Sequence, residues 1–188
     1  SDSMYDGRLM PAPEVADHRL EDLGAADRFG GAVCVFLDTA GKGWSEERDD
    51  DQSYFNRLQS ERVIDEARAL EKSGLPWSKI AIIAGYRAEV RLLRASLGAE
   101  LAAGLEVATV DAFQGREKEA VIVDLVRSND DGEVGFLADT RRMNVALTRA
   151  RRFLLVVGDS ATLAAHPYYR AFQAKIEEQG GYRSAWSI

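Results

Sequence analysis

The fold class of this chain is decided by residues 79–98, which read KIAIIAGYRAEVRLLRASLG. The first part is a short apolar run that stops at Gly85, and such a run predicts a strand buried on both faces. The second part places Val90, Leu93 and Leu97 on one face of a helix. A buried strand that leads through a short turn into an amphipathic helix indicates an α/β unit with a parallel sheet.

Four more apolar runs and two more amphipathic stretches continue this alternation. The expected strands cover 33–38, 105–110, 120–126 and 153–158, and the expected helices cover 55–73 and 139–150. We therefore predict an α/β fold with a parallel sheet of about five or more strands and helices on both faces.

We expect one domain over residues 1–188. Proline and glycine interrupt residues 1–31, which predicts an irregular lead-in. Residues 32–179 carry the expected strands and helices and form the predicted core, and residues 180–188 are predicted to be a tail. A chain of this length buries roughly 70% of its unfolded surface, which is enough for one substantial core.

Composition excludes several classes of protein. The chain has 24 Lys and Arg against 31 Asp and Glu, a formal net charge of −7, which argues against a surface covered in nucleic acid but permits a local basic face. Cys34 is the only cysteine, so an intramolecular disulfide and a multi-cysteine zinc site are excluded. The apolar runs are too short to span a membrane. We expect an intracellular, cytoplasmic protein without a membrane partner and without a metal site of its own.

The chain lacks both common phosphate-binding motifs. Neither a G-x-x-x-x-G-K-[ST] loop nor a G-x-G-x-x-G fingerprint occurs in it. If nucleotide chemistry takes place here, this chain does not hold the phosphates alone.

Two predicted turns at strand ends carry residues suited to phosphate ligands, and such ends are where open parallel sheets bind ligands. Gly85, Tyr86 and Arg87 follow one strand and combine a close backbone approach, a stacking face and a cation. Thr109 and Asp111 stand at the end of the next strand, where a dense polar segment around Gly115 begins. An ordinary strand-to-helix turn and an ordinary polar connector remain the alternatives.

A third segment reverses the charge of the chain locally. Five arginines stand within twelve residues on or beside the helix predicted over 139–150, and Arg142 and Arg149 are expected to share one stripe of it. The planar guanidinium suits bidentate phosphate contacts. The alternative is a solvated basic face paired with nearby acids. The five arginines are Arg141, Arg142, Arg149, Arg151 and Arg152.

Two of these segments resemble motifs of superfamily 1 helicases. Residues 110–118, VDAFQGREK, resemble motif V, and residues 141–151, RRMNVALTRAR, resemble motif VI. The wording is closest to the branch that contains the nonsense-mediated-decay helicase and senataxin. Shorter resemblances at 4–9, 53–61 and 82–90 follow in the family's order, so the likeness covers about residues 4–165.

The resemblance implies that the chain is the second, C-terminal RecA-like domain of such a helicase, a P-loop-type fold without its own P-loop. ATP and Mg²⁺ would then be held mainly by the first domain. By resemblance, Arg149 is the arginine finger, Arg142 a supporting cation, and Gly115 and Glu117 face the nucleotide. Gln114 would link the nucleotide to the nucleic acid.

The resemblance also implies partners. Single-stranded DNA or RNA would lie across Thr109, Asp111 and the turn 84–87, and the N-terminal RecA-like domain of the same parent protein would face the chain. We expect the isolated chain to be a monomer without ATPase activity. Two departures weaken the expected nucleic-acid contact: Ala84-Gly85 replaces the family's Thr-Pro, and Glu89 replaces the usual Gln, which adds a negative charge there.

Two other functions stay open at this point. The chain could be a non-catalytic nucleic-acid-binding or protein-binding module derived from a helicase half. It could also be an unrelated nucleotide-binding regulatory domain whose arginine helix binds an acidic partner. The helicase hypothesis predicts weak, salt-sensitive binding of single strands, which the regulatory domain would lack.

Overall fold

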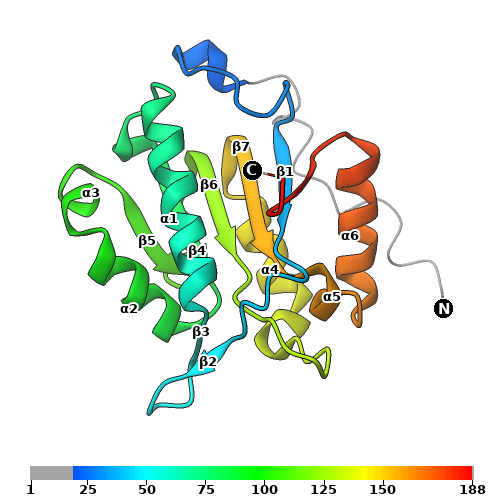
Figure 1. The fold of residues 1–188 in the computed structure, drawn as a ribbon. Helices are drawn as coiled ribbons and strands as arrows, with labels where there is room; N and C mark the ends of the chain where they lie inside the picture. Colours follow the sequence, from blue (N-terminus) through cyan, green and yellow to red (C-terminus); the bar gives the residue numbers. More distant parts are fainter. Residues whose placement is uncertain (1–18, 188) are drawn as a thin grey trace.

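The computed structural model describes residues 19–187, and within them six parallel strands form one sheet in the order β5-β4-β6-β7-β1-β8 (Figure 1). The strands are β1 (Cys34–Asp38), β4 (Ile80–Ala84), β5 (Glu106–Thr109), β6 (Lys118–Asp124), β7 (Ala150–Gly158) and β8 (Tyr182–Ser184). A separate antiparallel pair, β2 (Glu47–Arg48) and β3 (Tyr54–Phe55), extends beyond the ends of the strands at the bottom of Figure 1.

Helices cover both faces of the sheet. One core cluster joins it to α1 and α2, and a second joins it to α4, α5 and α6. Among residues 19–187 no helix is long and apolar enough to cross a membrane. The helices are α1 (Arg57–Lys72), α2 (Arg87–Ser96), α3 (Gly98–Ala102), α4 (Thr140–Leu147), α5 (Ser160–Leu163) and α6 (Pro167–Glu178), with 3-10 turns η2 (Leu20–Leu23), η3 (Trp77–Lys79) and η4 (Gly135–Ala138).

The continuous apolar strands are explained by this two-sided burial. On β4, Ile80 and Ile82 face the α1–α2 side, whereas Ala81 and Ile83 face the α4–α6 side. Successive side chains of a strand point to opposite faces, so a strand covered on both faces needs an apolar residue at every position. The predicted α/β fold, a parallel sheet of at least five strands with helices on both faces, is confirmed.

The prediction of an arginine-rich helix over 139–150 is wrong at the C-terminal end of that helix. Helix α4 stops at Leu147, and β7 starts at Ala150, earlier than the apolar run from Phe153 indicates. The strand extends because β6 pairs with it from Lys118 onward. Arg151 and Arg152 therefore stand on β7, where acidic residues of the β6 side pair with them at 3.0 and 2.9 Å.

Residues near both ends of the described chain pack into the domain, although the sequence predicted an irregular lead-in and a tail there. Within the expected tail, β8 pairs in parallel with β1 and forms an edge of the sheet. Within the expected lead-in, Phe29 is buried and stacks on Phe153 with ring centroids 5.2 Å apart. The resemblance at residues 4–9 lies outside the described residues.

Glu89 has a different role from the expected surface charge. It is 0% exposed, and its carboxyl group accepts a hydrogen bond from Asn56 N at 2.7 Å and lies against Ser60 and Asp124. Burial and the nearby Asp124 carboxylate raise the pKa of Glu89 to about 9. Burial raises the pKa of Asp124 as well, but Gln59 Nε2 and the backbone N–H of residue 126 donate to its carboxylate at 2.6 and 2.9 Å and favour its ionised form over that of Glu89. Glu89 therefore holds the proton of the pair and adds no charge to the surface.

We predict that Glu89→Gln stabilises the chain at neutral and alkaline pH. The folded state raises the pKa of Glu89 from 4.5 to about 9, so wild-type stability is greatest below the lower value and falls as pH rises through this window. A neutral amide removes that dependence. Urea unfolding at pH 5.5, 7 and 8.5 should show a flatter profile for Glu89→Gln and the wild-type slope for the exposed control Glu61→Gln. An unchanged slope in Glu89→Gln would contradict the assignment of the proton.

Candidate functional site

The predicted site residues fall into two groups, one where β4 and β5 end and the other where β6 and β7 begin. Thr109 ends β5, and the turn 85–86 follows the end of β4. In contrast, Glu117 and Arg149 stand immediately before β6 and β7 begin, where Lys118 N donates to Arg149 O at 3.1 Å. Because all these strands are parallel, the two groups are separated by the length of the central strands.

One segment, residues 110–117, connects the two groups. Val110 and Phe113 are buried in the same core cluster as α4, so the segment crosses the sheet on the α4 face. Thr109 Oγ1 accepts a hydrogen bond from the N–H of residue 112 at 3.3 Å and shapes the start of the segment. Gln114 is exposed in the turn that follows. Gly115 is also exposed and has a φ of +79°, a conformation that favours glycine.

Arg149 carries a guanidinium that no carboxylate neutralises within residues 19–187. Its Nε donates to Val145 O at 2.9 Å, and Nη2 contacts Thr148 Oγ1 at 3.4 Å, so the last turn of α4 fixes the side chain. Arg142, Arg151 and Arg152 each face two acidic side chains instead. Fixed position and uncompensated charge make Arg149 suited to an anionic ligand.

Glu117 faces Arg151 at 3.0 Å, and both side chains are about half exposed. Ion pairs at such exposure contribute little, so this pair opens at small cost when a ligand hydroxyl competes for the carboxylate. An open glycine turn, an available carboxylate and a guanidinium without a carboxylate partner have the chemistry to bind a hydroxyl and a phosphate. Among the described residues no group of three or more His, Cys, Asp or Glu side chains could hold a metal ion.

Arg142 belongs with the other group of residues. Its Nε lies 3.5 Å from Asp111 Oδ1 and 3.3 Å from Asp139 Oδ2, and its guanidinium lies 5.1 Å from the centre of the Phe136 ring. The stripe expected to join Arg142 to Arg149 does not form, because Arg142 stands in the first turn of α4 and Arg149 follows the helix.

The turn after β4 differs from its expected form. Tyr86 is only 9% exposed, and its ring packs edge-on against Tyr54 and Phe136, so the predicted stacking face is occupied by the protein. Gly85 is required by packing, because a Cβ there would lie 2.9 Å from the Phe136 ring. Of the three residues, Arg87 is the exposed one, and no ion pair holds it within the described chain.

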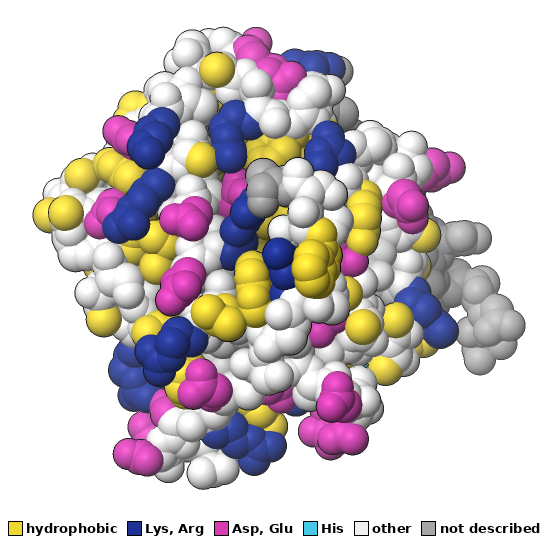
Figure 2. Space-filling model, viewed as in Figure 1, with side chains coloured by type: hydrophobic (Ala, Val, Ile, Leu, Met, Phe, Trp, Pro, Cys, Tyr) yellow, Lys and Arg dark blue, Asp and Glu magenta, His cyan; other side chains and the backbone are white. Residues whose placement is uncertain are grey.

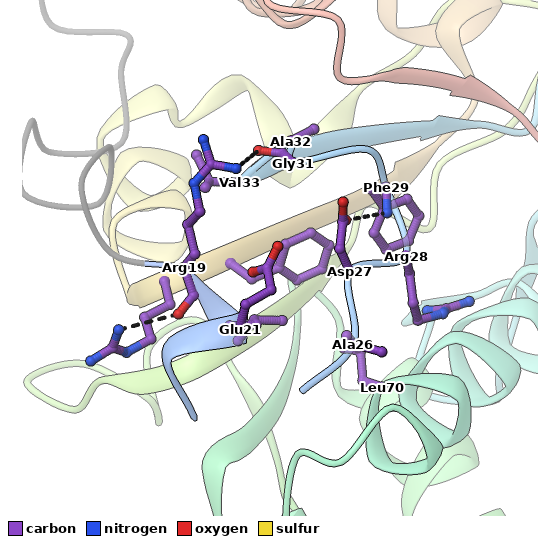
Figure 3. Close-up of a pocket in the computed structure, with 13 residues that line it drawn as sticks. Arg19, Glu21, Ala26, Asp27, Arg28, Phe29, Gly31, Ala32, Val33 and Leu70 are labelled. Atoms are coloured by element: carbon purple, nitrogen blue, oxygen red, sulfur yellow. Dashed lines mark hydrogen bonds between the residues drawn. The ribbon is translucent and has the colours of Figure 1, made fainter. Parts of the chain in front are cut away.

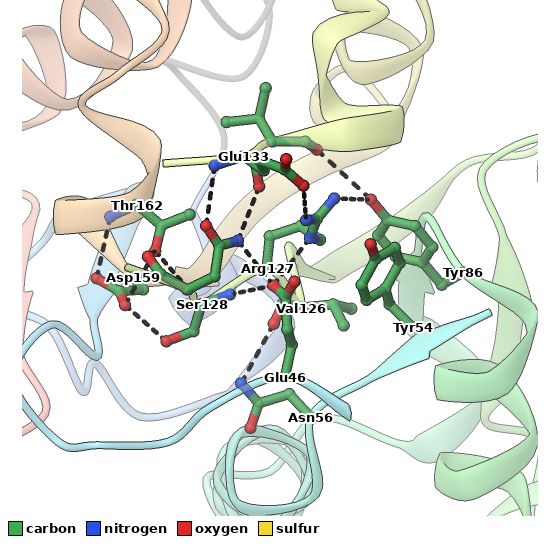
Figure 4. Close-up of polar contacts among 12 residues, drawn as sticks. Glu46, Tyr54, Asn56, Tyr86, Val126, Arg127, Ser128, Glu133, Asp159 and Thr162 are labelled. Carbon is green, nitrogen blue, oxygen red and sulfur yellow. Dashed lines mark hydrogen bonds and ion pairs between the residues drawn. The ribbon is translucent and has the colours of Figure 1, made fainter. Parts of the chain in front are cut away.

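A buried polar cluster beside this turn was missed by the sequence analysis. Its centre is Arg127, which Figure 4 shows between Glu46, Tyr54 and Tyr86. Arg127 directly follows the apolar run 120–126, and the sequence analysis assigned it no role. Its position within Leu125-Val126-Arg127, without a break before it, was the available signal.

Two hollows are poor candidates for a nucleotide site. The cavity in Figure 3, between η2, residues 26–33 and the start of β7, has about 20 Å³, room for about one water molecule. An open groove beyond β1 is lined by the glycines of Gly41-Lys42-Gly43 but also by Glu46, Asp130, Asp131 and Asp159, which repel phosphate. On the face seen in Figure 2, basic and acidic side chains alternate without a large patch of one sign.

Comparisons with known proteins identify the family to which the chain belongs. The family profile described as "AAA domain" matches residues 1–161. DNA-binding protein SMUBP-2 of Rattus norvegicus is 46% identical over 189 residues, which is 99% of this chain and 19% of that protein. DNA polymerase alpha-associated DNA helicase A of Schizosaccharomyces pombe is 41% identical over 171 residues, 87% of this chain and 26% of that protein.

Regulator of nonsense transcripts 1 of Caenorhabditis elegans is 40% identical over 120 residues, 61% of this chain and 11% of that protein. A solved structure described as the C-terminal domain of a possible DNA helicase from a Lactobacillus matches with a TM-score of 0.48 and 18% identity, over 81% of this chain and 85% of that one. The chain thus spans about a quarter or less of these three curated relatives. The predicted resemblance is confirmed, and the chain belongs to the AAA domain family.

Proposed function

We propose that this chain is the C-terminal motor domain of an ATP-dependent DNA or RNA helicase and that it completes an ATP site whose P-loop lies in the N-terminal RecA-like domain of the same protein. The observation that carries the proposal is the Arg149 guanidinium, fixed by α4 but without a carboxylate partner among the described residues, beside the 115–117 segment of a sequence without a phosphate loop. The names of the relatives, a DNA helicase among them, support it.

Each residue of this group has a separate role in the proposal. Hydrolysis of ATP supplies the free energy of the motor, and Mg²⁺ belongs to the first domain. Arg149 stabilises negative charge on the γ-phosphate as hydrolysis proceeds, and Gly115 lets the main chain approach the nucleotide. Glu117 accepts a hydrogen bond from the ribose after its surface pair with Arg151 opens. Gln114 lies in the segment that connects the two groups of site residues, and it links the nucleotide to the nucleic acid.

The group of residues where β4 and β5 end contacts single-stranded DNA or RNA. Arg87 and the backbone around Gly85 meet phosphates, together with Thr109 and the Asp111–Arg142 pair. Arg142 therefore acts on the nucleic-acid side, with any effect on the nucleotide passing through α4. Tyr86 supports the turn from inside. A monomeric isolated chain and a cytoplasmic location stay predictions.

We predict that the isolated chain hydrolyses no ATP, because the phosphate loop and the Mg²⁺ ligands are supplied by another domain. Phosphate release would be measured with the purified chain, with and without oligo(dT) or oligo(U), beside the full-length protein as the positive control. Steady turnover by the chain alone would contradict the proposal. A full-length protein that binds single strands but does not hydrolyse ATP would instead favour a non-catalytic binding module.

We predict that Arg149→Ala lowers ATP turnover of the full-length protein by about 10³-fold or more, the range for loss of an arginine finger. ATP binding should survive, because most phosphate contacts belong to the other domain. Steady-state turnover and equilibrium binding of a fluorescent ATP analogue test both parts.

Arg141→Ala is the matched control, because Arg141 is exposed on α4 and has no ion pair within the described chain. Equal turnover in Arg149→Ala and the control would show that Arg149 is not the finger.

A further inference from the structure

Arg127 is a buried cation that contacts several loops at once (Figure 4). The residue is 1% exposed, and its Nε donates to Glu46 Oε2 at 2.8 Å. The guanidinium lies over the Tyr54 ring, 4.0 Å from its centre, and Nη1 donates to Tyr86 Oη at 3.4 Å. One planar group thus joins the loop after β1, strand β3, the turn after β4 and the loop after β6.

The backbone that directs Arg127 inward is strained. Val126 has a φ of +66°, a conformation that β-branched residues rarely adopt, and Arg127 N donates to Leu125 O across it at 2.6 Å. Asn56 Nδ2 donates to Val126 O at 3.2 Å and holds the turn in place. Strain that the surroundings maintain in this way is common where a fold positions a functional group.

Two contacts lead from Arg127 to the start of α4. Tyr86 Oη, which accepts from Arg127, also accepts from Phe136 N at 3.2 Å. The Phe136 ring lies against Gly85 on one side and near the Arg142 guanidinium, at 5.1 Å, on another. The turn that we assign to nucleic acid and the helix that ends beside Arg149 are therefore held in one arrangement by Tyr86 and Phe136.

The position of Arg127 is also defined from the opposite side. Gly135 has a φ of +53°, and a Cβ at this position would collide with Arg127 Nη1. Glu46 is fixed in turn by Ser128 N at 2.7 Å and Asn129 Nδ2 at 3.1 Å. Glu46 therefore has two hydrogen-bond donors besides Arg127.

We propose that Arg127 is a positioning residue that couples nucleic-acid binding at the 84–87 turn to ATP hydrolysis through Tyr86, Phe136 and α4. The inference rests on the proposed function. Arg127 touches neither ligand in this scheme. It fixes the position of the 84–87 turn relative to the start of α4. Nucleic acid bound at the turn can therefore shift α4 and the Arg149 that follows it.

The test measures ATP turnover of the full-length protein without nucleic acid and with saturating oligo(dT) or oligo(U), and takes the ratio of the two rates. Arg127→Lys keeps the positive charge beside Glu46 but loses the planar guanidinium that reaches Glu46 and Tyr86 at once. We therefore expect the ratio of the two rates to fall at least tenfold. Tyr86→Phe removes only the hydroxyl between Arg127 and Phe136, and we expect a several-fold fall. Arg91→Ala, which removes an exposed arginine paired with Asp49, should keep the wild-type ratio.

The ratio separates coupling from simple loss of folded protein, which lowers both rates equally. If Arg127→Lys does not melt cooperatively, the rate ratios of Gly135→Ala and Tyr86→Phe test the inference in its place. Gly135→Ala displaces the Arg127 guanidinium without changing its chemistry. Wild-type ratios in these variants would overturn the inference and leave the proposed function intact. A wild-type protein without ATP turnover, or without stimulation by single strands, would overturn both.

Discussion

The pairing of β6 with β7 at the centre of the sheet is the interaction on which the rest of the structure depends. Its first hydrogen bond, from Lys118 N to Arg149 O, sets Glu117 and Arg149 side by side where the two strands begin. At the other end, β6 leads into Asp124, the strained Val126 and the buried Arg127. This pair of strands therefore positions Glu117 and Arg149 at one end, and at the other end it positions Arg127, which contacts the turn after β4 through Tyr86.

This arrangement requires apolar side chains on both faces of β6 and β7 and leaves polar chemistry to their ends. Two of the charged groups that do enter the interior have a specific acidic or basic partner there. Glu89 keeps its proton beside Asp124, and Arg127 pairs with Glu46. A buried charge without a partner would be costly. These pairs therefore explain why acidic and basic residues occur in the interior near the ends of β4 and β6.

The arginines of the 141–152 stretch show how structure separates residues that look alike in sequence. Arg142 is engaged by Asp111 and Asp139, and Arg151 and Arg152 pair with acids on the β6 side. Within the described residues Arg141 and Arg149 have no carboxylate partner, and of these two Arg149 is the one held by hydrogen bonds. The net charge of −7 hid this difference, because it reports totals and not pairings.

The sequence by itself determined the α/β class, the elements β4 to α2 and the two motif segments, because burial on both faces and helical amphipathicity leave local periodic patterns. It also determined the resemblance that the family match confirmed. The end of α4, the strand β8, the proton on Glu89, the buried ring of Tyr86 and the Arg127 cluster were decided only by tertiary structure. Each depends on a partner from a distant part of the chain, such as Arg149 O with Lys118 N or Arg127 with Glu46, and no local pattern encodes which partner will be near.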